Sequence, residues 1–286
     1  MKILSFGEII WDVYSDGAFI GGAPLNLAAH AALQGADAWA VSAVGDDELG
    51  KKAFAKVKEL GVKTEYIGIS DKTTGKCLVT LDENSIPSYN VLENTAYDYI
   101  DVPVFKDGEE FDILAFGTLA LRGENNIKTL KKLIDMKISD KIYSDLNIRP
   151  PFYSERSIRF CLENAHIVKI SDEELPTVLE MIDVPCTDTE NAMKILSEKY
   201  PQLEYILITC GDKGAYCYDT DNIYFVSATK TDVASTVGAG DSFGATFLVE
   251  LLKGKTIPEC LNMASRVSAF VVSQSGAVPY YDIKSL

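Results

Sequence analysis

The chain has 286 residues, and its 27 basic and 42 acidic side chains give a formal net charge of −15. A surface this acidic repels phosphate backbones and anionic headgroups, so the charge disfavours nucleic acid and membrane surfaces as partners. The length suits one large α/β domain or two small ones, with enough apolar residues for a sizeable core. We therefore expect the ligand to be a small molecule.

Two features predict a cytoplasmic protein. The first seven residues have the pattern of a strand rather than of a signal peptide, and no later window has the roughly 18 uninterrupted apolar residues of a membrane-spanning helix. The six cysteines lack C-x-x-C spacing and have only two histidines to join them, which disfavours structural zinc and predicts reduced thiols.

In chain order, short β-branched runs alternate with longer segments of helical periodicity. This alternation is typical of βαβ units and of a parallel sheet that is covered on both faces. Two further helices are expected near the C-terminus, over about 240–253 and 257–274. The predicted strands cover residues 3–6, 39–44, 113–116, 142–145, 167–170 and 205–209.

Two stretches, at about 13–20 and 74–97, interrupt the alternation with strands that have no helix of their own. We expect them to be antiparallel strands outside the main sheet, with a turn at residues 84–87. They would form a small sheet that acts as a lid or as an oligomer contact.

The strongest local signal is a glycine turn that leads into an apolar helix at residues 236–244, Thr-Val-Gly-Ala-Gly-Asp-Ser-Phe-Gly. Such a turn presents free backbone N–H groups and the positive end of the helix dipole, which together bind anions. Asp241 lies within it and suits a general base that deprotonates a hydroxyl. The alternative is that Asp241 only caps the helix. The Rossmann and P-loop fingerprints are both absent from the chain.

A second glycine motif, at residues 21–26, opens an alanine-rich helix with Pro24 in its first turn. Paired glycines allow a ligand to approach the backbone closely. Asn26, and Asp12 at the end of the first strand, could then hydrogen-bond sugar hydroxyls. The alternative is that Gly21 and Gly22 form only a turn.

The motifs at residues 21–26, 45–50 and 238–241 occur together in this order. With them, the chain resembles the ribokinase-like (PfkB) sugar kinases from Gly7 to about Pro279. The segments 75–81, 97–100, 145–150 and 276–279 are most similar to those of fructokinases. The resemblance implies a single α/β domain over residues 1–286, with three α/β/α layers, a mostly parallel central sheet and a small β-sheet lid. It also implies transfer of phosphate from Mg-ATP to the 6-hydroxyl of fructose.

The resemblance assigns a role to each motif. Asp241 would be the catalytic base, and the amides of Gly238, Ala239 and Gly240 would bind the transferring phosphoryl group. The nucleotide would lie between residues 209–214 and the last helix, and the lid would cover the sugar and pair two subunits. The implied sugar ligands are Asp12, Gly21, Gly22 and Asn26, and the implied nucleotide ligands are Thr209, Gly211, Gly214, Asn262 and Ser265.

Three departures from the family pattern bear on ions and substrate. Ser235 stands where relatives have an Asp that helps to bind a monovalent cation, which places K⁺ activation in doubt. Relatives have an N-x-x-E segment that helps to position Mg²⁺ through water. In this chain Ser171 stands in place of the Asn, and the Glu is kept as Glu174. Glu93 lies near the place where relatives that phosphorylate 2-keto-3-deoxygluconate carry an Arg, so a neutral sugar is favoured.

Other interpretations stay open at this point. Arg149 ends a predicted buried strand and points to the crevice where α/β folds bind ligands, or it is a structural Arg that pairs with Asp145 or another carboxylate. His30 fits a packing role better than a chemical one. Ribose, 2-keto-3-deoxygluconate or a nucleoside could replace fructose as the acceptor, and a catalytically weak sugar-sensing protein is a further alternative.

Overall fold

The computed structural model describes residues 1–14, 17–81 and 87–286. Within these residues the main sheet has nine strands in the order β13-β12-β11-β10-β9-β8-β1-β4-β5. All neighbours from β5 to β11 are parallel, whereas β12 and β13 continue one edge antiparallel. The mostly parallel sheet expected from the sequence is therefore confirmed. Its strands are β1 (Lys2–Phe6), β4 (Asp37–Gly45), β5 (Ile67–Ser70), β8 (Phe111–Gly117), β9 (Ser139–Asp145), β10 (Ile167–Ser171), β11 (Tyr205–Thr209), β12 (Gly214–Tyr218) and β13 (Ile223–Ser227).

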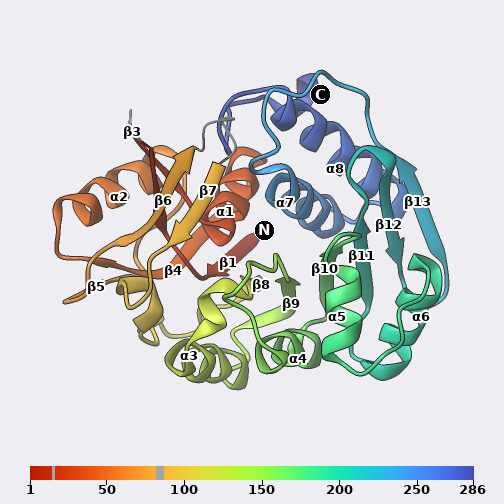
Figure 1. Cartoon of the computed structure of the whole chain (residues 1–286), viewed down its shortest axis with the longest axis horizontal. Coiled ribbons are helices and arrows are strands. Elements are labelled where there is room, and N and C mark those ends of the chain that lie inside the picture. Colours follow the sequence, from red (N-terminus) through yellow and green to blue (C-terminus); the bar gives the residue numbers. More distant parts are fainter. Residues whose placement is uncertain (15–16, 82–86) are drawn as a thin grey trace.

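Helices cover both faces of this sheet, as Figure 1 shows, with α3 to α6 along one side and α1, α7 and α8 on the other. Successive side chains of a strand point to opposite faces of the sheet, so each strand contributes to an apolar core on either face. Leu4 and Phe6 of β1 pack with α3 and α4, whereas Ile3 packs with α1 and α7. The helices are α1 (Ala23–Leu33), α2 (Glu48–Glu59), α3 (Glu124–Asp135), α4 (Glu155–Asn164), α5 (Leu175–Met181), α6 (Thr189–Lys199), α7 (Ala239–Leu252) and α8 (Ile257–Val272).

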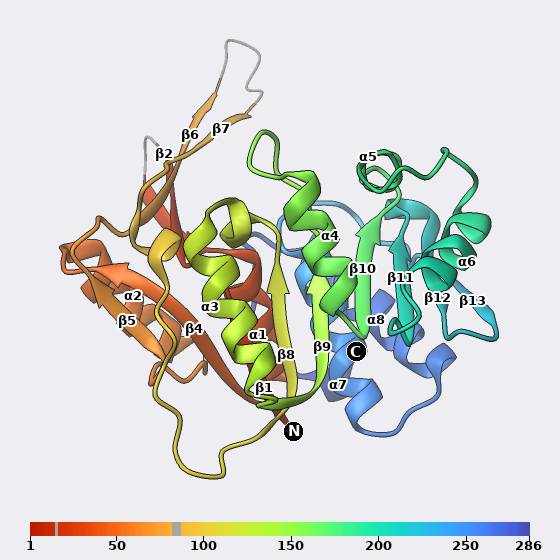
Figure 2. The ribbon, with the colours of Figure 1, turned by 90° about the horizontal axis from the view of Figure 1, so that it is seen from below.

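The second sheet has the order β3-β2-β6-β7 in the described part of the chain. Its strands are β2 (Ile10–Tyr14), β3 (Gly17–Gly21), β6 (Gly75–Leu81) and β7 (Pro87–Val91). The pairs β2–β3 and β6–β7 are antiparallel as expected, while β2 and β6 join the two hairpins in parallel. Most of the turn predicted at 84–87 lies outside the described residues. Figure 2 shows β6 and β7 projecting from the body of the molecule.

Short 3-10 helices complete the fold: η1 (Ala96–Tyr99), η2 (Leu119–Arg122), η3 (Gly211–Lys213) and η4 (Ile283–Ser285). No helix among the described residues is long and apolar enough to cross a bilayer. The six cysteines are free thiols, and Cys217 lies opposite Leu207 in the β11–β12 hairpin rather than opposite Cys210.

Candidate active site

The glycine turn before α7 forms the helix N-terminus that the sequence predicts. Gly238 is the N-cap, with a left-handed φ of 82° that favours glycine. A Cβ atom at this position would lie 2.3 Å from the carbonyl oxygen of Ala277, so a side chain is excluded as well. Because Gly238 is the cap, Asp241 is not, and its Oδ2 instead accepts a 2.8 Å hydrogen bond from Asn26 Nδ2.

The N-terminus of α1 lies beside that of α7, because the two helices pack against each other (Figure 1). Gly22 is the N-cap of α1, with φ 117°, and a Cβ there would lie 2.3 Å from the backbone oxygen of Glu8. At Gly21 a Cβ would lie 3.1 Å from Oδ2 of Asp12. The structure thus brings the predicted sugar ligands Asp12, Gly21, Gly22 and Asn26 together with Asp241.

Arg149 follows the carboxyl end of β9 and is exposed. It does not pair with Asp145, whose two oxygens each accept a 2.8 Å hydrogen bond from Lys169 Nζ. Burial raises the pKa values of Asp12 and Asp241, and the positive charge of Arg149 opposes both shifts, although Arg149 forms no ion pair with any residue of the described segments. Of the two interpretations of Arg149, the structure therefore favours a side chain that faces the sugar ligands.

A buried ion pair lies directly beneath the glycine turn. Lys169 of β10 and Asp145 of β9 are 5% and 6% exposed. A Cβ on Gly240 would lie 3.2 Å from Lys169 Nζ, so the ammonium group rests against the first turn of α7. This places a positive charge on the protein side of the predicted phosphoryl site.

Burial raises the pKa of several carboxyl groups at the site. The pKa of Asp241 is raised by burial, and the hydrogen bond from Asn26 and the charges of Lys169 and Arg149 oppose the shift. Burial raises the pKa of Asp145 to about 6 against the opposing charge of Lys169. Raised carboxyl pKa values are common where a site has to take up a proton.

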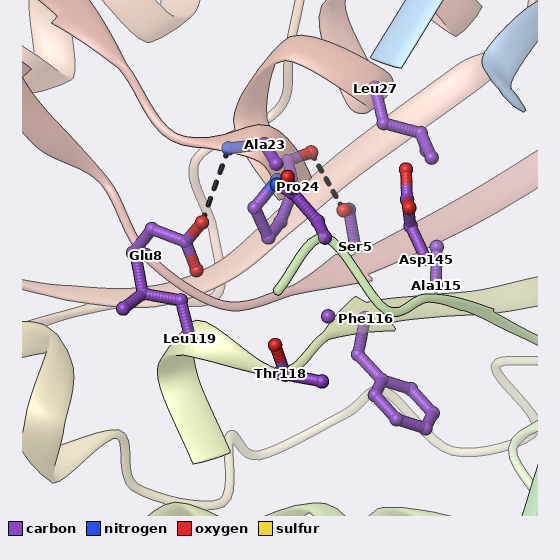
Figure 3. A pocket seen from close by; sticks show the side chains of 12 residues that line it. Ser5, Glu8, Ala23, Pro24, Leu27, Ala115, Phe116, Thr118, Leu119 and Asp145 are labelled. Atoms are coloured by element: carbon purple, nitrogen blue, oxygen red, sulfur yellow. Dashed lines mark hydrogen bonds between the residues drawn. The ribbon is translucent and has the colours of Figure 1, made fainter. Parts of the chain in front are cut away.

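Glu8, at the carboxyl end of β1, forms one wall of a pocket together with the start of α1 (Figure 3). Its Oε1 accepts a hydrogen bond of 3.2 Å from the Ala23 N–H, while its buried Oε2 has no partner among the described residues. Burial raises the pKa of Glu8 to about 7. The pocket is lined further by residues from the ends of β8 and β9, which are Phe116, Gly117, Thr118, Asp145 and Asn147.

The predicted nucleotide ligands lie at the far edge of the sheet, where α8 packs against β12 and β13. Thr209 ends β11, while Gly211 and Gly214 bound the 3-10 turn η3 and have positive φ. In α8, Ser265 Oγ accepts a 3.0 Å hydrogen bond from the Thr229 N–H, and Asn262 is exposed. The structure thus places these segments side by side, as the predicted nucleotide site requires.

Glu174 is held by backbone groups at the ends of two strands. Its Oε1 accepts from the Ile148 N–H at 2.5 Å and its Oε2 accepts from the Ser171 N–H at 2.8 Å. The described residues contain no cluster of three or more metal-ligating side chains.

A glycine-lined helix N-terminus with a carboxylate in its first turn, below a β-sheet lid, has the geometry of an enzyme that transfers a phosphoryl group to a hydroxyl. The family model described as "pfkB family carbohydrate kinase" matches residues 4–283. The chain therefore belongs to the pfkB family, and it is an ATP-dependent carbohydrate kinase, a phosphotransferase with an alcohol acceptor.

Relatives with known names differ in their acceptors. The chain is 26% identical to an ATP-dependent 6-phosphofructokinase of Thermoanaerobacterium thermosaccharolyticum, over 99% of this chain and 95% of the relative. It is 26% identical to probable fructokinase-5 of Arabidopsis thaliana, over 97% and 93%. It is 30% identical to 5-dehydro-2-deoxygluconokinase of Shouchella clausii, over 94% and 86%.

Solved structures share the whole fold. An uncharacterized sugar kinase from Pyrococcus horikoshii in complex with ATP has a TM-score of 0.84 and 26% identity, over 99% of this chain and 96% of that one. A putative ribokinase II of E. coli in complex with ATP and Mg²⁺ also has a TM-score of 0.84, at 20% identity, over 99% and 98%. The three-layer fold with its lid is thereby confirmed.

The structure adds two charged residues that the sequence analysis did not single out. Lys169 interrupts the apolar run of β10, and Glu8 directly follows Gly7 at the end of β1. In each case the available signal was a charge inside or beside a buried strand, where charged side chains are rare unless they are paired.

Proposed function

We propose that this carbohydrate kinase transfers the γ-phosphate of ATP to the 6-hydroxyl of fructose. The observation that carries the proposal is the 2.8 Å hydrogen bond between Asn26 and Asp241, which joins a predicted sugar ligand to the predicted base. Asp12, Gly21, Gly22, Asn26 and Arg149 would hold the sugar. Its reacting hydroxyl would then lie against the carboxylate of Asp241.

In the proposed reaction Asp241 accepts the hydroxyl proton while the sugar oxygen forms a bond to the γ-phosphorus. The bond between that phosphorus and the bridging oxygen of ADP breaks in line. The amides of Gly238, Ala239 and Gly240 stabilise the charge on the transferring group. Lid closure by β2, β3, β6 and β7 would exclude water that could otherwise accept the phosphoryl group.

We further propose that Thr209, Gly211, Gly214, Asn262 and Ser265 contact the nucleotide. Bound Mg²⁺ neutralises phosphate charge, and Glu174 would contact this ion through water, because each of its oxygens keeps a free lone pair. Ser235 uses its hydroxyl oxygen to accept from the Val237 N–H at 3.2 Å. Since this hydroxyl replaces a carboxylate, we expect turnover to be independent of K⁺.

An acidic sugar is the second candidate acceptor, and Arg149 supports it. This exposed guanidinium lies within electrostatic reach of Asp12 and Asp241. Arginine binds a carboxylate through two parallel hydrogen bonds. The name of the relative 5-dehydro-2-deoxygluconokinase also indicates an acidic sugar as acceptor.

A substrate panel tests the proposal. ADP release with Mg-ATP would be measured for fructose, ribose, glucose, 2-keto-3-deoxygluconate and adenosine, with and without K⁺. We expect the highest kcat/KM for fructose. A preference for the acidic sugar, abolished in Arg149→Met but kept in the control Arg156→Met, whose exposed side chain pairs with Glu124 at the start of α3, would instead establish the second candidate.

A further inference from the structure

His30 connects α1 with the C-terminal segment that follows α8. The side chain is fully buried, with Nε2 2.9 Å from the Ala277 carbonyl oxygen and Nδ1 3.0 Å from the Tyr281 hydroxyl. A carbonyl oxygen only accepts, so Nε2 carries the proton and Nδ1 accepts from Tyr281. Both ring nitrogens are therefore used, and burial keeps the imidazole neutral by lowering its pKa to about 4.

The hydrogen bonds continue from Tyr281 to the first turn of α7. Gln34 Nε2 donates to the Tyr281 oxygen at 3.0 Å and to Thr246 Oγ1 at 2.8 Å. Thr246 Oγ1 in turn donates to the backbone oxygen of Ser242 at 2.8 Å. Ser242 directly follows Asp241, so the network ends one residue from the proposed base.

The other end of the network lies behind the glycine turn. A Cβ on Gly238 would lie 2.3 Å from the Ala277 oxygen and 2.8 Å from the Ala277 Cα, which shows how closely the two backbones approach. Whatever fixes Ala277 therefore also limits where Gly238 and the amides that follow it can lie. In the described structure the side chain that donates to the Ala277 carbonyl is His30.

Asn26 and His30 are one turn apart on α1, and together they give this helix two contacts with the transfer site. Asn26 contacts Asp241 directly, and His30 contacts the segment behind Gly238. The base and the anion-binding turn are thus aligned against the same rigid element. Catalysis is sensitive to misplacements of about 1 Å, so such alignment affects the rate.

We propose that His30 is a positioning residue for phosphoryl transfer, which acts through Ala277 and Tyr281 on the glycine turn of α7. The proposal rests on the proposed function of that turn as the phosphate-binding site. It predicts that loss of the His30 hydrogen bonds lowers kcat/KM for ATP even when the variant remains folded.

The test compares His30→Met, which fills the space without hydrogen bonds, with His30→Gln, which keeps a donor toward Ala277. The control is His166→Met, because His166 is half-buried and its Nδ1 accepts from the Ile142 N–H, away from the site. We expect His30→Met to lower kcat/KM for ATP at least tenfold and to weaken ATP binding in calorimetry. His30→Gln should recover most of this loss, and His166→Met should change neither quantity more than twofold.

A lower melting temperature in His30→Met with unchanged ATP binding and kcat would overturn the proposal, because His30 would then be only structural. If His30→Met does not fold, Tyr281→Phe removes the second anchor while keeping the ring. The proposal then predicts a lower kcat/KM for ATP in Tyr281→Phe, and an unchanged kcat/KM in this variant would have the same meaning. Failure of the proposed function is distinct, since the unaltered protein would then show no preference for fructose in the acceptor panel, before any variant is compared.

Discussion

At the scale of single residues, Asp241 is the group on which the proposed chemistry depends most. Asp241→Asn keeps the size of the side chain and a hydrogen bond to Asn26 but removes the base. We expect turnover to fall by about 10²–10⁴, the usual contribution of a general base, while sugar binding persists. Steady-state kinetics and calorimetric titration with the sugar would check both parts, and near-normal turnover would exclude Asp241 as the base.

Lys169 should set the pH range in which Asp241 is ionised. Its ammonium lies against Gly240 and lowers the pKa of Asp241, so Lys169→Met should raise that pKa. The base is active only when ionised, and the acidic limb of the kcat profile should therefore move to higher pH. Lys63→Met, which removes an exposed lysine paired with Asp37, is the control and should leave the limb in place.

Glu8 should make stability depend on pH. Its pKa is about 7 in the folded protein, above the ordinary value of 4.5, so between these values the folded state binds more protons than the unfolded state. The free energy of unfolding should thus rise as the pH falls from 8 to 5, by on the order of 1–3 kcal/mol. In chemical denaturation, the free energy of unfolding of Glu8→Gln should depend less on pH than that of the unaltered protein. The same pH dependence in both proteins would contradict this role of Glu8.

At the scale of elements, Arg122 ties the lid to the main body. Its guanidinium donates to both oxygens of Asp98 in η1 at 2.7 Å and to the Leu92 carbonyl, just after β7, at 2.8 Å. It also lies between the rings of Tyr97 and Phe152, with centroids 4.9 and 5.0 Å away. This one side chain fixes the point where the lid returns to the sheet.

Arg122→Met should therefore leave the carboxylate of Asp98 buried without its cation. We expect a loss of about 3–5 kcal/mol in the free energy of unfolding, as is usual when one partner of a buried ion pair is removed. Arg156→Met breaks an exposed pair with Glu124 and should cost at most about 1 kcal/mol. Urea unfolding would compare the two, and equal losses would refute the role of Arg122.

The sequence predicts the elements better than their long-range pairing. The β-branched runs locate the central strands to within a few residues because local periodicity marks a buried strand. The parallel pairing of β2 with β6 depends on residues that are distant in sequence, and periodicity does not encode it. The partners of Lys169 and His30 were unpredictable for the same reason, since a lone charge or histidine in a buried segment does not reveal which group satisfies it.

At the scale of the whole molecule, the lid surface bears on the proposed homodimer. Phe19 and Leu78 on the lid strands are 63% and 37% exposed. They lie on opposite faces of the small sheet, because their cross-strand partners are the consecutive residues Asp12 and Val13. Exposed apolar side chains on both faces of a small sheet favour contact with another protein. Phe19→Ser with Leu78→Ser should shift a dimer toward the monomer in analytical ultracentrifugation. Phe225→Ser, at the opposite edge strand β13, should not do so. A monomeric unaltered protein would refute the dimer.

The hydrogen bond between Asn26 and Asp241 spans 215 positions of the chain, and the bond between His30 and Tyr281 spans 251. During synthesis the ribosome therefore releases the sugar-binding half long before the residues that complete the site. We therefore expect that a nascent chain cannot assemble the proposed site until residues 277–281 have left the exit tunnel. A stop codon shortly before Tyr281 would accordingly yield a protein that keeps the proposed sugar ligands but lacks the contacts of His30 with Tyr281.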